Sequence, residues 1–458
     1  MNENPADLAP ELCVLLAAVL GLLAGMFLPR AGQWRVAAVC AAGLAAALAV
    51  ALVAATRPGL MAFDAFTVDP VTHVTRIAVF GTTLPVVVLA AGRMRGHPRE
   101  SEFSVLILLA ALGTVLLGAS SDLLVLVAAY LLASIPAYAL AGFGKDGPGT
   151  EAALKYYLMG AFLGVLMLAG VTLLYGVGRG TSYAALRDGL GAAPGAAVAV
   201  GTVALLAGLL FKAGAVPGHY WVPDVAEGAP PVVAAFVTTV PKIGAFAALF
   251  RIGAEVLPPG AFAWAPLVAL VAAVTMTLGN LAAFAQDNVR RLLAYSTVGQ
   301  AGYLLVPVAM AGRAALAEPA LLYYVAAYAV TNLGAFAVVV AVGRDDLAGY
   351  TGLLRASPAL GTSLVVCLLG LVGTPPTAVF VGKLLMFGAA LEGHYAWLAA
   401  LAAANSVASV FYYLRWIVPA FGGPAAPLRP ARSALVVAVA LAAVSLALGI
   451  GSGLVLAA

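Results

Sequence analysis

The chain has 458 residues, of which 64% are hydrophobic and only 9% are charged. Soluble domains carry roughly 25% charged residues, so this composition excludes an ordinary water-soluble globular protein. The net charge of +4 is small and the basic residues are dispersed, which argues against a nucleic-acid partner.

Apolar runs of about 20 residues recur along the whole chain, and each is long enough to cross a bilayer as a helix. The runs are continuously apolar rather than alternating, so they predict transmembrane helices and not a membrane barrel. We therefore expect an all-α, polytopic transmembrane helical bundle of about 14 helices. In chain order the expected spans are residues 11–29, 34–56, 71–92, 103–119, 121–143, 153–176, 195–217, 229–250, 263–285, 291–312, 319–342, 358–390, 396–421 and 433–456.

Loop charges predict the orientation of the bundle, because cytoplasmic loops carry an excess of Lys and Arg. If the N-terminus lies outside, the inner loops hold twelve basic residues and the outer loops hold five. The inner set is Arg30, Arg35, Arg93, Arg95, Arg99, Lys145, Arg290, Arg291, Arg344, Arg355, Arg429 and Arg432, and the outer set is Arg57, Arg179, Arg187, Arg251 and Arg313. Both termini are therefore expected on the extracytoplasmic side of a cell inner (plasma) membrane.

Four of the five lysines fall inside apolar spans, whereas nearly all 18 arginines mark loops or span ends. The four are Lys155, Lys212, Lys242 and Lys383. A cation at the middle of a bilayer costs roughly 2.5–3.5 kcal/mol on insertion scales, and a buried Lys, unlike Arg, can release its proton. These lysines therefore predict a proton pathway. The structural alternative is a stem in apolar surroundings with its amine at the interface, which fits Lys155 best because it lies near the start of its span.

Proline lies close to Lys212, Lys242 and Lys383, and it interrupts the seventh and twelfth expected helices. Interrupted helices at matching positions in two halves of a membrane protein point to inverted repeats with ion sites at the interruptions. We therefore expect one membrane domain over residues 1–458 that contains two inverted five-helix repeats. The expected boundaries are 103–250 for the first repeat, 263–421 for the second, and 11–92 and 433–456 for the flanking helices.

Residues 211–249 carry a long pattern, FK-x-x-x-VP-x-H-x-W-x-PD-x-x-EGAP followed by TTVPKIGAF. This pattern resembles the antiporter-like membrane subunits of proton-pumping NADH–quinone oxidoreductase, respiratory complex I. Among these subunits, residues 280–305, 370–387 and 405–417 look most like subunit N. The matches follow the family order over about residues 60–420.

The resemblance implies specific roles for the lysines. Lys212 matches the lysine of the broken seventh helix that loads a proton, Lys242 the central lysine, and Lys383 the lysine of the broken twelfth helix. Lys155 matches a lysine of the sixth span that extends the hydrophilic axis.

The resemblance also implies that this subunit binds no cofactor or metal of its own. NADH, FMN, iron–sulfur clusters and quinone would belong to partner subunits, and quinone reduction there would drive proton transport here. The expected partners are the antiporter-like subunit M, the small membrane subunits and the lipid bilayer.

Four further residues are possible accessories of the pathway. His219, Asp224 and Glu227 follow the seventh-helix interruption, where they form either a polar mouth, an interface with a neighbouring subunit, or packing that fixes the interruption. Asp224 or Glu227 could serve as the counter-charge of Lys212. Gln300 stands where the family usually has a histidine, and it can hold water by hydrogen bonds but cannot titrate.

Leu131 stands where the family usually carries a glutamate that pairs with the seventh-helix lysine. The sequence therefore predicts that Lys212 lacks this acidic partner, and it leaves two alternatives to a proton-translocating subunit open. One is a subunit of a multi-subunit cation/proton antiporter or a membrane-bound hydrogenase. The other is a non-pumping structural paralogue.

Overall fold

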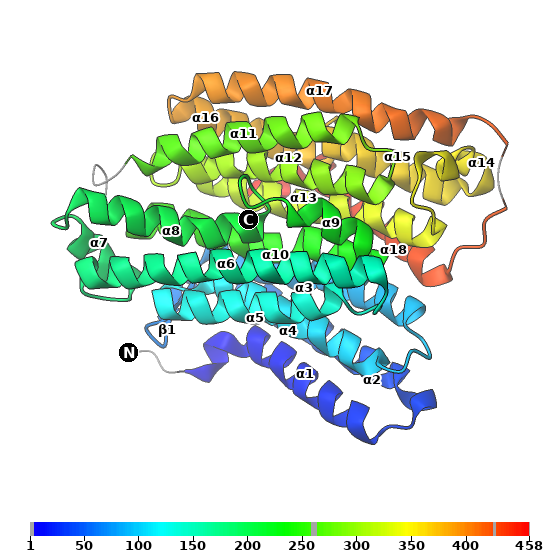
Figure 1. Cartoon of the computed structure of the whole chain (residues 1–458), viewed down its shortest axis with the longest axis horizontal. Coiled ribbons are helices and arrows are strands. Elements are labelled where there is room, and N and C mark those ends of the chain that lie inside the picture. Colours follow the sequence, from blue (N-terminus) through cyan, green and yellow to red (C-terminus); the bar gives the residue numbers. More distant parts are fainter. Residues whose placement is uncertain (1–3, 258–262, 425–426, 458) are drawn as a thin grey trace.

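A computed structural model describes residues 4–257, 263–424 and 427–457. Long helices run side by side along one axis, and the loops that connect them lie at the two opposite ends of the bundle (Figure 1). The helices are α1 Ala9–Phe27, α2 Trp34–Ala54, α3 Pro70–Arg93, α4 Glu100–Ala119, α5 Leu123–Ala141, α6 Gly147–Gly178, α7 Tyr183–Leu190, α8 Gly195–Ala213, α9 Trp221–Gly228, α10 Pro231–Arg251, α11 Trp264–Phe284, α12 Val289–Ala309, α13 Ala317–Val342, α14 Leu353–Ala356, α15 Pro358–Val372, α16 Ala378–Glu392, α17 Ala396–Phe421, α18 Arg432–Ile450 and α19 Ser452–Ala457.

The expected all-helical membrane fold is confirmed. Within the described residues, thirteen helices are long and apolar enough to cross a membrane. The shorter helices α15 and α16 together fill the expected span 358–390, with an interruption at residues 373–377. Counting this pair as one broken span gives the expected fourteen.

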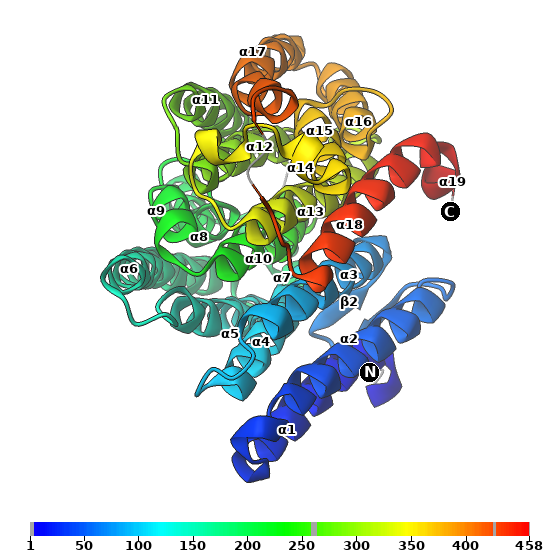
Figure 2. The same ribbon diagram turned by 90° about the vertical axis from the view of Figure 1, so that its right-hand side faces the viewer.

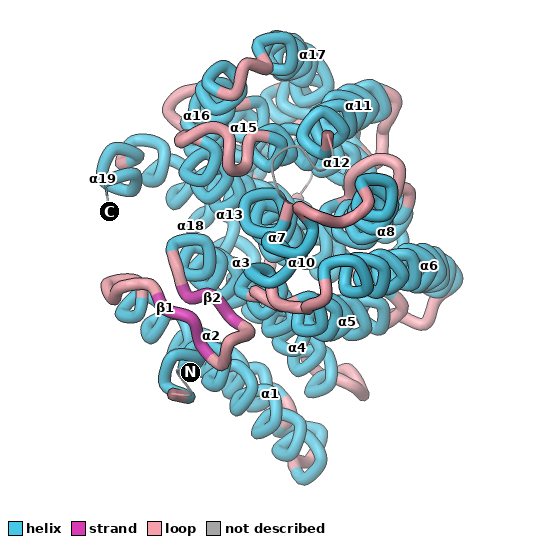
Figure 3. The backbone as a smooth tube through the Cα atoms, turned by 90° about the vertical axis from the view of Figure 1, so that its left-hand side faces the viewer, coloured by secondary structure: helices cyan, strands magenta, loops and turns pink. Residues whose placement is uncertain are grey.

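One short hairpin was not expected from the sequence. Strands β1 (Leu60–Ala62) and β2 (Phe66–Val68) pair antiparallel between α2 and α3, with Met61 opposite Thr67. Figure 3 shows this hairpin at the end of the bundle that also carries α7. The apolar span 34–56 ends just before it, so the hairpin closes a loop outside the membrane-spanning helices.

Helix α10 is the centre of the bundle. Every residue of its most apolar 18-residue stretch is buried, and it packs against α3, α4, α8, α12 and α13. A helix that is buried on all sides has no face turned to the surroundings of the bundle, so its polar groups must find partners inside it. Small residues allow the close approach: a Cβ on Gly244 would lie 2.1 Å from the carbonyl oxygen of Thr114 in α4. The outer helices instead expose large apolar side chains, as α6 does with Leu158, Phe162 and Val165.

Candidate functional site

The seventh span is interrupted directly after the lysine that it carries. Helix α8 ends at Ala213, and Gly214 takes a left-handed conformation with φ of 75°. The N–H of Ala215 then bonds the carbonyl of Leu210, 2.9 Å away, which closes the helix end as a Schellman motif. Pro217 cannot continue the helix, and the chain resumes as α9 at Trp221.

Lys242 reaches this interruption from the central helix α10. Its side chain is buried, with 1% of its surface exposed, and its Nζ donates a hydrogen bond of 2.6 Å to the carbonyl oxygen of Ala213. The last carbonyls of a helix have no partner within the helix and form its negative end. The amine of Lys242 therefore occupies the site where α8 best accommodates a cation. The ring of Trp221 lies 5.4 Å from the same amine.

The twelfth span is built in the same way. Helix α15 ends at Val372, Gly373 has φ of 89°, and the N–H of Thr374 bonds the carbonyl of Leu369 at 3.1 Å. Lys383, on the second half α16, donates 2.8 Å to the carbonyl oxygen of Val372. Its amine also bonds Ser406 Oγ at 3.0 Å and lies 4.3 Å from the ring of Tyr303.

The two glycines at these helix ends leave room for the lysines. A Cβ on Gly214 would lie 2.3 Å from Lys242 Nζ, and a Cβ on Gly373 would lie 2.8 Å from Lys383 Cδ. Both positions also have a positive φ, which costs other L-residues roughly 1–2 kcal/mol. Each helix end therefore requires its glycine for two reasons: the backbone conformation and the space that the lysine occupies.

Lys212 lies in the last turn of α8 and is 1% exposed. Its Nζ donates 2.6 Å to Ser134 Oγ on α5 and lies 5.4 Å from the ring of Tyr130. Among the described residues it forms no ion pair. Leu131, one turn before Ser134, is 42% exposed on the outer surface of the bundle. Ser134 is thus the residue of α5 that accepts a hydrogen bond from Lys212, a role that sequence alone did not reveal.

Buried polar groups fill the space between α10, α12, α13 and α15. The hydroxyl of Tyr328 lies 2.8 Å from the carbonyl oxygen of Thr238 and 3.0 Å from Thr297 Oγ1, while Asn332 Nδ2 donates 2.9 Å to Thr239 Oγ1. Thr238 lies one helical turn before Lys242. We call the set Thr238, Thr239, Thr297, Gln300, Tyr324, Tyr328 and Asn332 the polar column.

Gln300 joins the polar column to the second interruption. Its Nε2 donates 2.8 Å to the carbonyl oxygen of Leu371, the residue before Val372, and its Oε1 accepts 2.6 Å from the hydroxyl of Tyr324. The expected accessory residue therefore lies next to the helix end that holds Lys383.

A second group of polar residues surrounds Ser406 on the far side of Lys383. Ser406 Oγ donates to the hydroxyl of Tyr303 at 3.3 Å. Asn280 Nδ2 donates 3.0 Å to Asn405 Oδ1, and the hydroxyl of Tyr412 donates 3.2 Å to Asn280 Oδ1. From this group Lys383 meets the hydroxyl of Ser406 and the ring of Tyr303, and among the described residues it pairs with no carboxylate.

Lys155 is not embedded in the bundle interior, which agrees with the interface alternative for this lysine. Its side chain is 46% exposed and pairs with Glu151 at 2.7 Å and Asp224 at 2.9 Å. Its position in the first part of α6 places it at the end of the bundle, where the polar end of a lysine is stable. It lies apart from the three buried lysines.

Asp224 and Glu227 are not counter-charges of Lys212. Arg291 binds both carboxylates, Asp224 at 3.1 Å and Glu227 at 2.7 Å, and Asn288 donates to Glu227 at 3.3 Å. Together with Lys155 they line an open pocket of about 780 Å³ at the bundle end. The polar-mouth interpretation fits this geometry.

His219 lies in the interruption between α8 and α9 and is 4% exposed. Its Nδ1 has no hydrogen-bond partner within the described residues, and its ring packs against Tyr220 with centroids 4.4 Å apart. These contacts favour the packing interpretation of His219.

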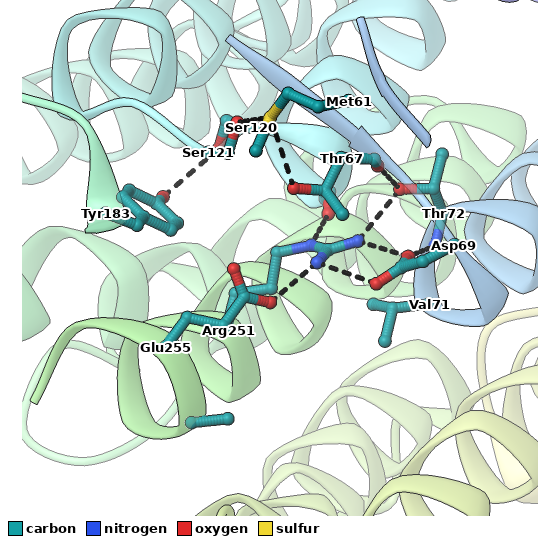
Figure 4. A network of polar contacts seen from close by, with 12 residues as sticks. Met61, Thr67, Asp69, Val71, Thr72, Ser120, Ser121, Tyr183, Arg251 and Glu255 are labelled. Atoms are coloured by element: carbon teal, nitrogen blue, oxygen red, sulfur yellow. Dashed lines mark hydrogen bonds and ion pairs between the residues drawn. The ribbon is translucent and has the colours of Figure 1, made fainter. Parts of the chain in front are cut away.

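Arg251 is not a loop residue, although its position suggested one. It is fully buried at the end of α10, where it binds Asp69 at 3.0 Å, Glu255 at 2.7 Å and the carbonyl oxygen of Gly118 at 2.7 Å. Figure 4 shows its guanidinium between the two carboxylates and Thr72. The arginine thus fixes α10 to the start of α3 and to the end of α4.

A second buried arginine lies inside the third expected span, where its burial was not predicted. Arg76 on α3 pairs with Glu11 on α1 at 2.6 Å, and both side chains are buried. The pair tethers the first helix to the bundle. A partner 65 positions away could not be recognised from one sequence.

The chain is similar to known membrane proteins. The family model described as NADH:quinone oxidoreductase/Mrp antiporter, TM, matches residues 120–411. NADH-quinone oxidoreductase subunit N 1 of Streptomyces griseus is 52% identical over 460 aligned positions, which cover 100% of this chain and 98% of that protein.

Two solved structures have the same fold. A chain in the structure of respiratory complex I from Thermus thermophilus with bound aureothin superimposes with a TM-score of 0.86 at 36% identity and covers 98% of this chain and 99% of its own. A chain of the Mrp complex from a Dietzia species superimposes with a TM-score of 0.84 over 98% and 96% of the two chains. At 24% identity this second likeness shows a shared fold alone.

Proposed function

The chain belongs to the NADH-quinone oxidoreductase subunit N family, and from that membership we propose that it carries protons across the membrane through Lys212, Lys242 and Lys383. The observation that supports this most is the repeated helix end. Two buried amines, those of Lys242 and Lys383, each bind the last carbonyl of an interrupted helix and have no carboxylate partner among the described residues.

Such an amine is suited to changing its protonation state. Burial disfavours the ammonium form, because the charge loses its hydration. The negative end of the helix and its free carbonyl favour the same form. The two effects oppose each other, so a small change in nearby charge or water is enough to load or release a proton. A lysine held by a buried carboxylate would instead remain charged.

The polar column gives a route between the sites. It extends from Thr238, one turn before Lys242, through Tyr328 and Thr297 to Gln300 beside the end of α15. Lys212 lies close to the Lys242 end of this route, because Lys242 binds the carbonyl of Ala213, the residue that follows Lys212 in the chain. Hydroxyl and amide groups can hold water and pass protons without carrying a permanent charge. Lys155 belongs in this proposal to the polar mouth, where protons would enter.

The helix order supports inverted repeats over residues 103–250 and 263–421. If each long helix crosses the membrane, α8 and α15 run in opposite directions, and each is interrupted after its first half by a left-handed glycine. Figure 1 shows α8 next to α7 at one end of the bundle and α15 next to α14 at the other. The helices in 11–92 and 433–456 flank the two repeats.

We assign the chain to the cell inner membrane as one subunit of a multi-subunit complex, with both termini extracytoplasmic. With the buried Arg290 and Arg251 left out, the loop bias becomes eleven (twelve minus one) against four (five minus one). Subunit M and the small membrane subunits would be its neighbours. NADH, FMN, iron–sulfur clusters and quinone would lie in partner subunits, and this subunit would hold no redox site of its own.

The test is proton translocation by the intact complex in inverted membrane vesicles. Lys242→Ala and Lys383→Ala should each lower the protons moved per NADH oxidised, while the complex still assembles. Lys145→Ala, which removes an exposed loop lysine, is the matched control and should pump normally. Normal pumping by both variants would show that Lys242 and Lys383 serve only in packing, and would favour a non-pumping structural role for the chain.

A further inference from the structure

A basic pocket lies at the end of the bundle opposite the β1–β2 hairpin. Helices α3 and α13 end here and α18 begins here, and Figure 2 looks onto this end with α18 beside α3 and α13. The pocket has a volume of about 460 Å³ and contains an arginine from each of three separate segments. We call this site, lined by Arg93, Arg344 and Arg429, the arginine pocket.

The three arginines have no acidic partner. Within the described ranges none of them forms an ion pair. Asp345 follows Arg344 in the chain but binds Arg290 at 2.7 Å and lines the polar mouth instead. Among the residues that the structure describes, no Asp or Glu lines the arginine pocket. Three guanidinium groups without counter-charge around one cavity repel each other, so an anion bound between them would stabilise this end of the bundle.

The surroundings of the pocket indicate the kind of anion. Its lining also includes Leu89, Val340 and Leu428, and Leu89 and Val340 lie within about one turn of the ends of spanning helices. A ligand here therefore meets basic groups, with the partly exposed Leu428 beside them, at the depth where helices leave the hydrocarbon layer. Arginine binds phosphate through paired N–H groups. Basic pockets between transmembrane helices on the cytoplasmic side are suited to anionic lipid headgroups.

We propose that the arginine pocket binds the phosphate headgroup of an anionic glycerophospholipid, whose acyl chains lie along α3 and α18. The phosphate would be held by Arg93, Arg344 and Arg429. This site is separate from the buried lysines, and its existence does not depend on proton transport by them.

The test is native mass spectrometry of the purified full chain titrated with phosphatidylglycerol. A variant with Arg93→Gln, Arg344→Gln and Arg429→Gln should lose the tightest bound lipid. Each arginine near a membrane surface contributes about 1 kcal/mol to the binding free energy of an anionic lipid, which is roughly fivefold in affinity. The matched control changes Arg30, Arg35 and Arg95 to Gln, three exposed arginines of the same expected face that do not line the pocket. It should bind the lipid like the parent.

Three outcomes would overturn the proposal. The first is equal lipid binding by the pocket variant and the parent. The second is equal loss in the pocket variant and the control, which would indicate general attraction to a basic surface. The third is displacement of the lipid by 10 mM inorganic phosphate, which would make free phosphate the ligand. Circular dichroism and gel filtration of both variants should match the parent, since the substituted side chains are exposed.

Discussion

The amine of Lys242 lies 2.6 Å from the carbonyl oxygen of Ala213, so a lysine of the central helix caps the end of a helix that it does not belong to. Lys383 caps the end of α15 in the same way from the other half of its own broken span. Lys242 reaches its carbonyl from a neighbouring span and Lys383 from within its own span, but both amines bind the last carbonyl of an interrupted helix. A proton carried by either amine therefore changes the charge at the end of an interrupted helix.

Gly214→Ala and Gly373→Ala should each impair proton translocation without preventing assembly. An added Cβ would occupy the position of the Lys242 amine in the first case and press on the Lys383 stem in the second. Gly96→Ala is the matched control, because Gly96 has a similar φ of 81° but no neighbouring atom within 4 Å of its Cβ position. The measurement is the ratio of protons moved to NADH oxidised. A defect of equal size in the control would assign the effect to backbone strain.

Ser134→Asp should slow proton release from Lys212, whereas Leu131→Glu should change it less. Ser134 already bonds the Lys212 amine at 2.6 Å, so a carboxylate there would form an ion pair and hold the proton. A stabilisation of only about 1.4 kcal/mol shifts proton release tenfold. Leu131 instead faces the outside of the bundle. Pumping rates of the two variants in vesicles provide the comparison, and a larger effect at Leu131 would show that position to be the true partner of Lys212.

Arg251→Gln should destabilise the protein strongly. It would leave Asp69 and Glu255 without their buried partner, and breaking a buried ion pair from one side typically costs about 3–5 kcal/mol. The measurement is thermal unfolding of the purified chain in detergent, and Arg313→Gln, at an exposed position in the turn between α12 and α13, is the control. Equal unfolding temperatures for the two variants would contradict a structural role for Arg251.

Asp64→Cys in the hairpin turn should react with a membrane-impermeant maleimide added to intact cells, and Arg95→Cys should not. Both positions are exposed and lie at opposite ends of α3. The natural cysteines Cys13, Cys40 and Cys367 would first be replaced by serine or alanine. Labelling of Arg95→Cys alone would reverse the orientation derived from the loop charges.

Much of the fold followed from the sequence because membrane helices leave a strong signal. Each apolar run had to become a helix, and prolines near residues 217 and 375 marked the two interruptions. The burial of Lys212, Lys242 and Lys383 agrees with their placement in apolar spans. Residues near helix ends were harder to place, because the position of a side chain there depends on its partner. Arg251 and Lys155 each pair with two carboxylates, but the side chain of Arg251 is fully buried whereas that of Lys155 remains at the surface.

The partners of the buried lysines could not be predicted. Ser134 and the carbonyl of Ala213 become contacts of lysines only after helices distant in sequence pack together. A backbone carbonyl carries no residue identity at all, so no motif can specify it. The polar column has the same origin, since Thr238, Tyr328 and Thr297 come from three separate helices and each resembles an ordinary membrane residue on its own.

The complete enclosure of α10 has a consequence for the order in which the protein is made. Three of the helices around it, α3, α4 and α8, are synthesised before it, but α12 and α13 follow it. During synthesis one side of α10, with Thr238 and Thr239, therefore faces lipid or the insertion machinery until the second half of the chain arrives. The helix that carries Lys242 is in the membrane early and reaches its native surroundings late.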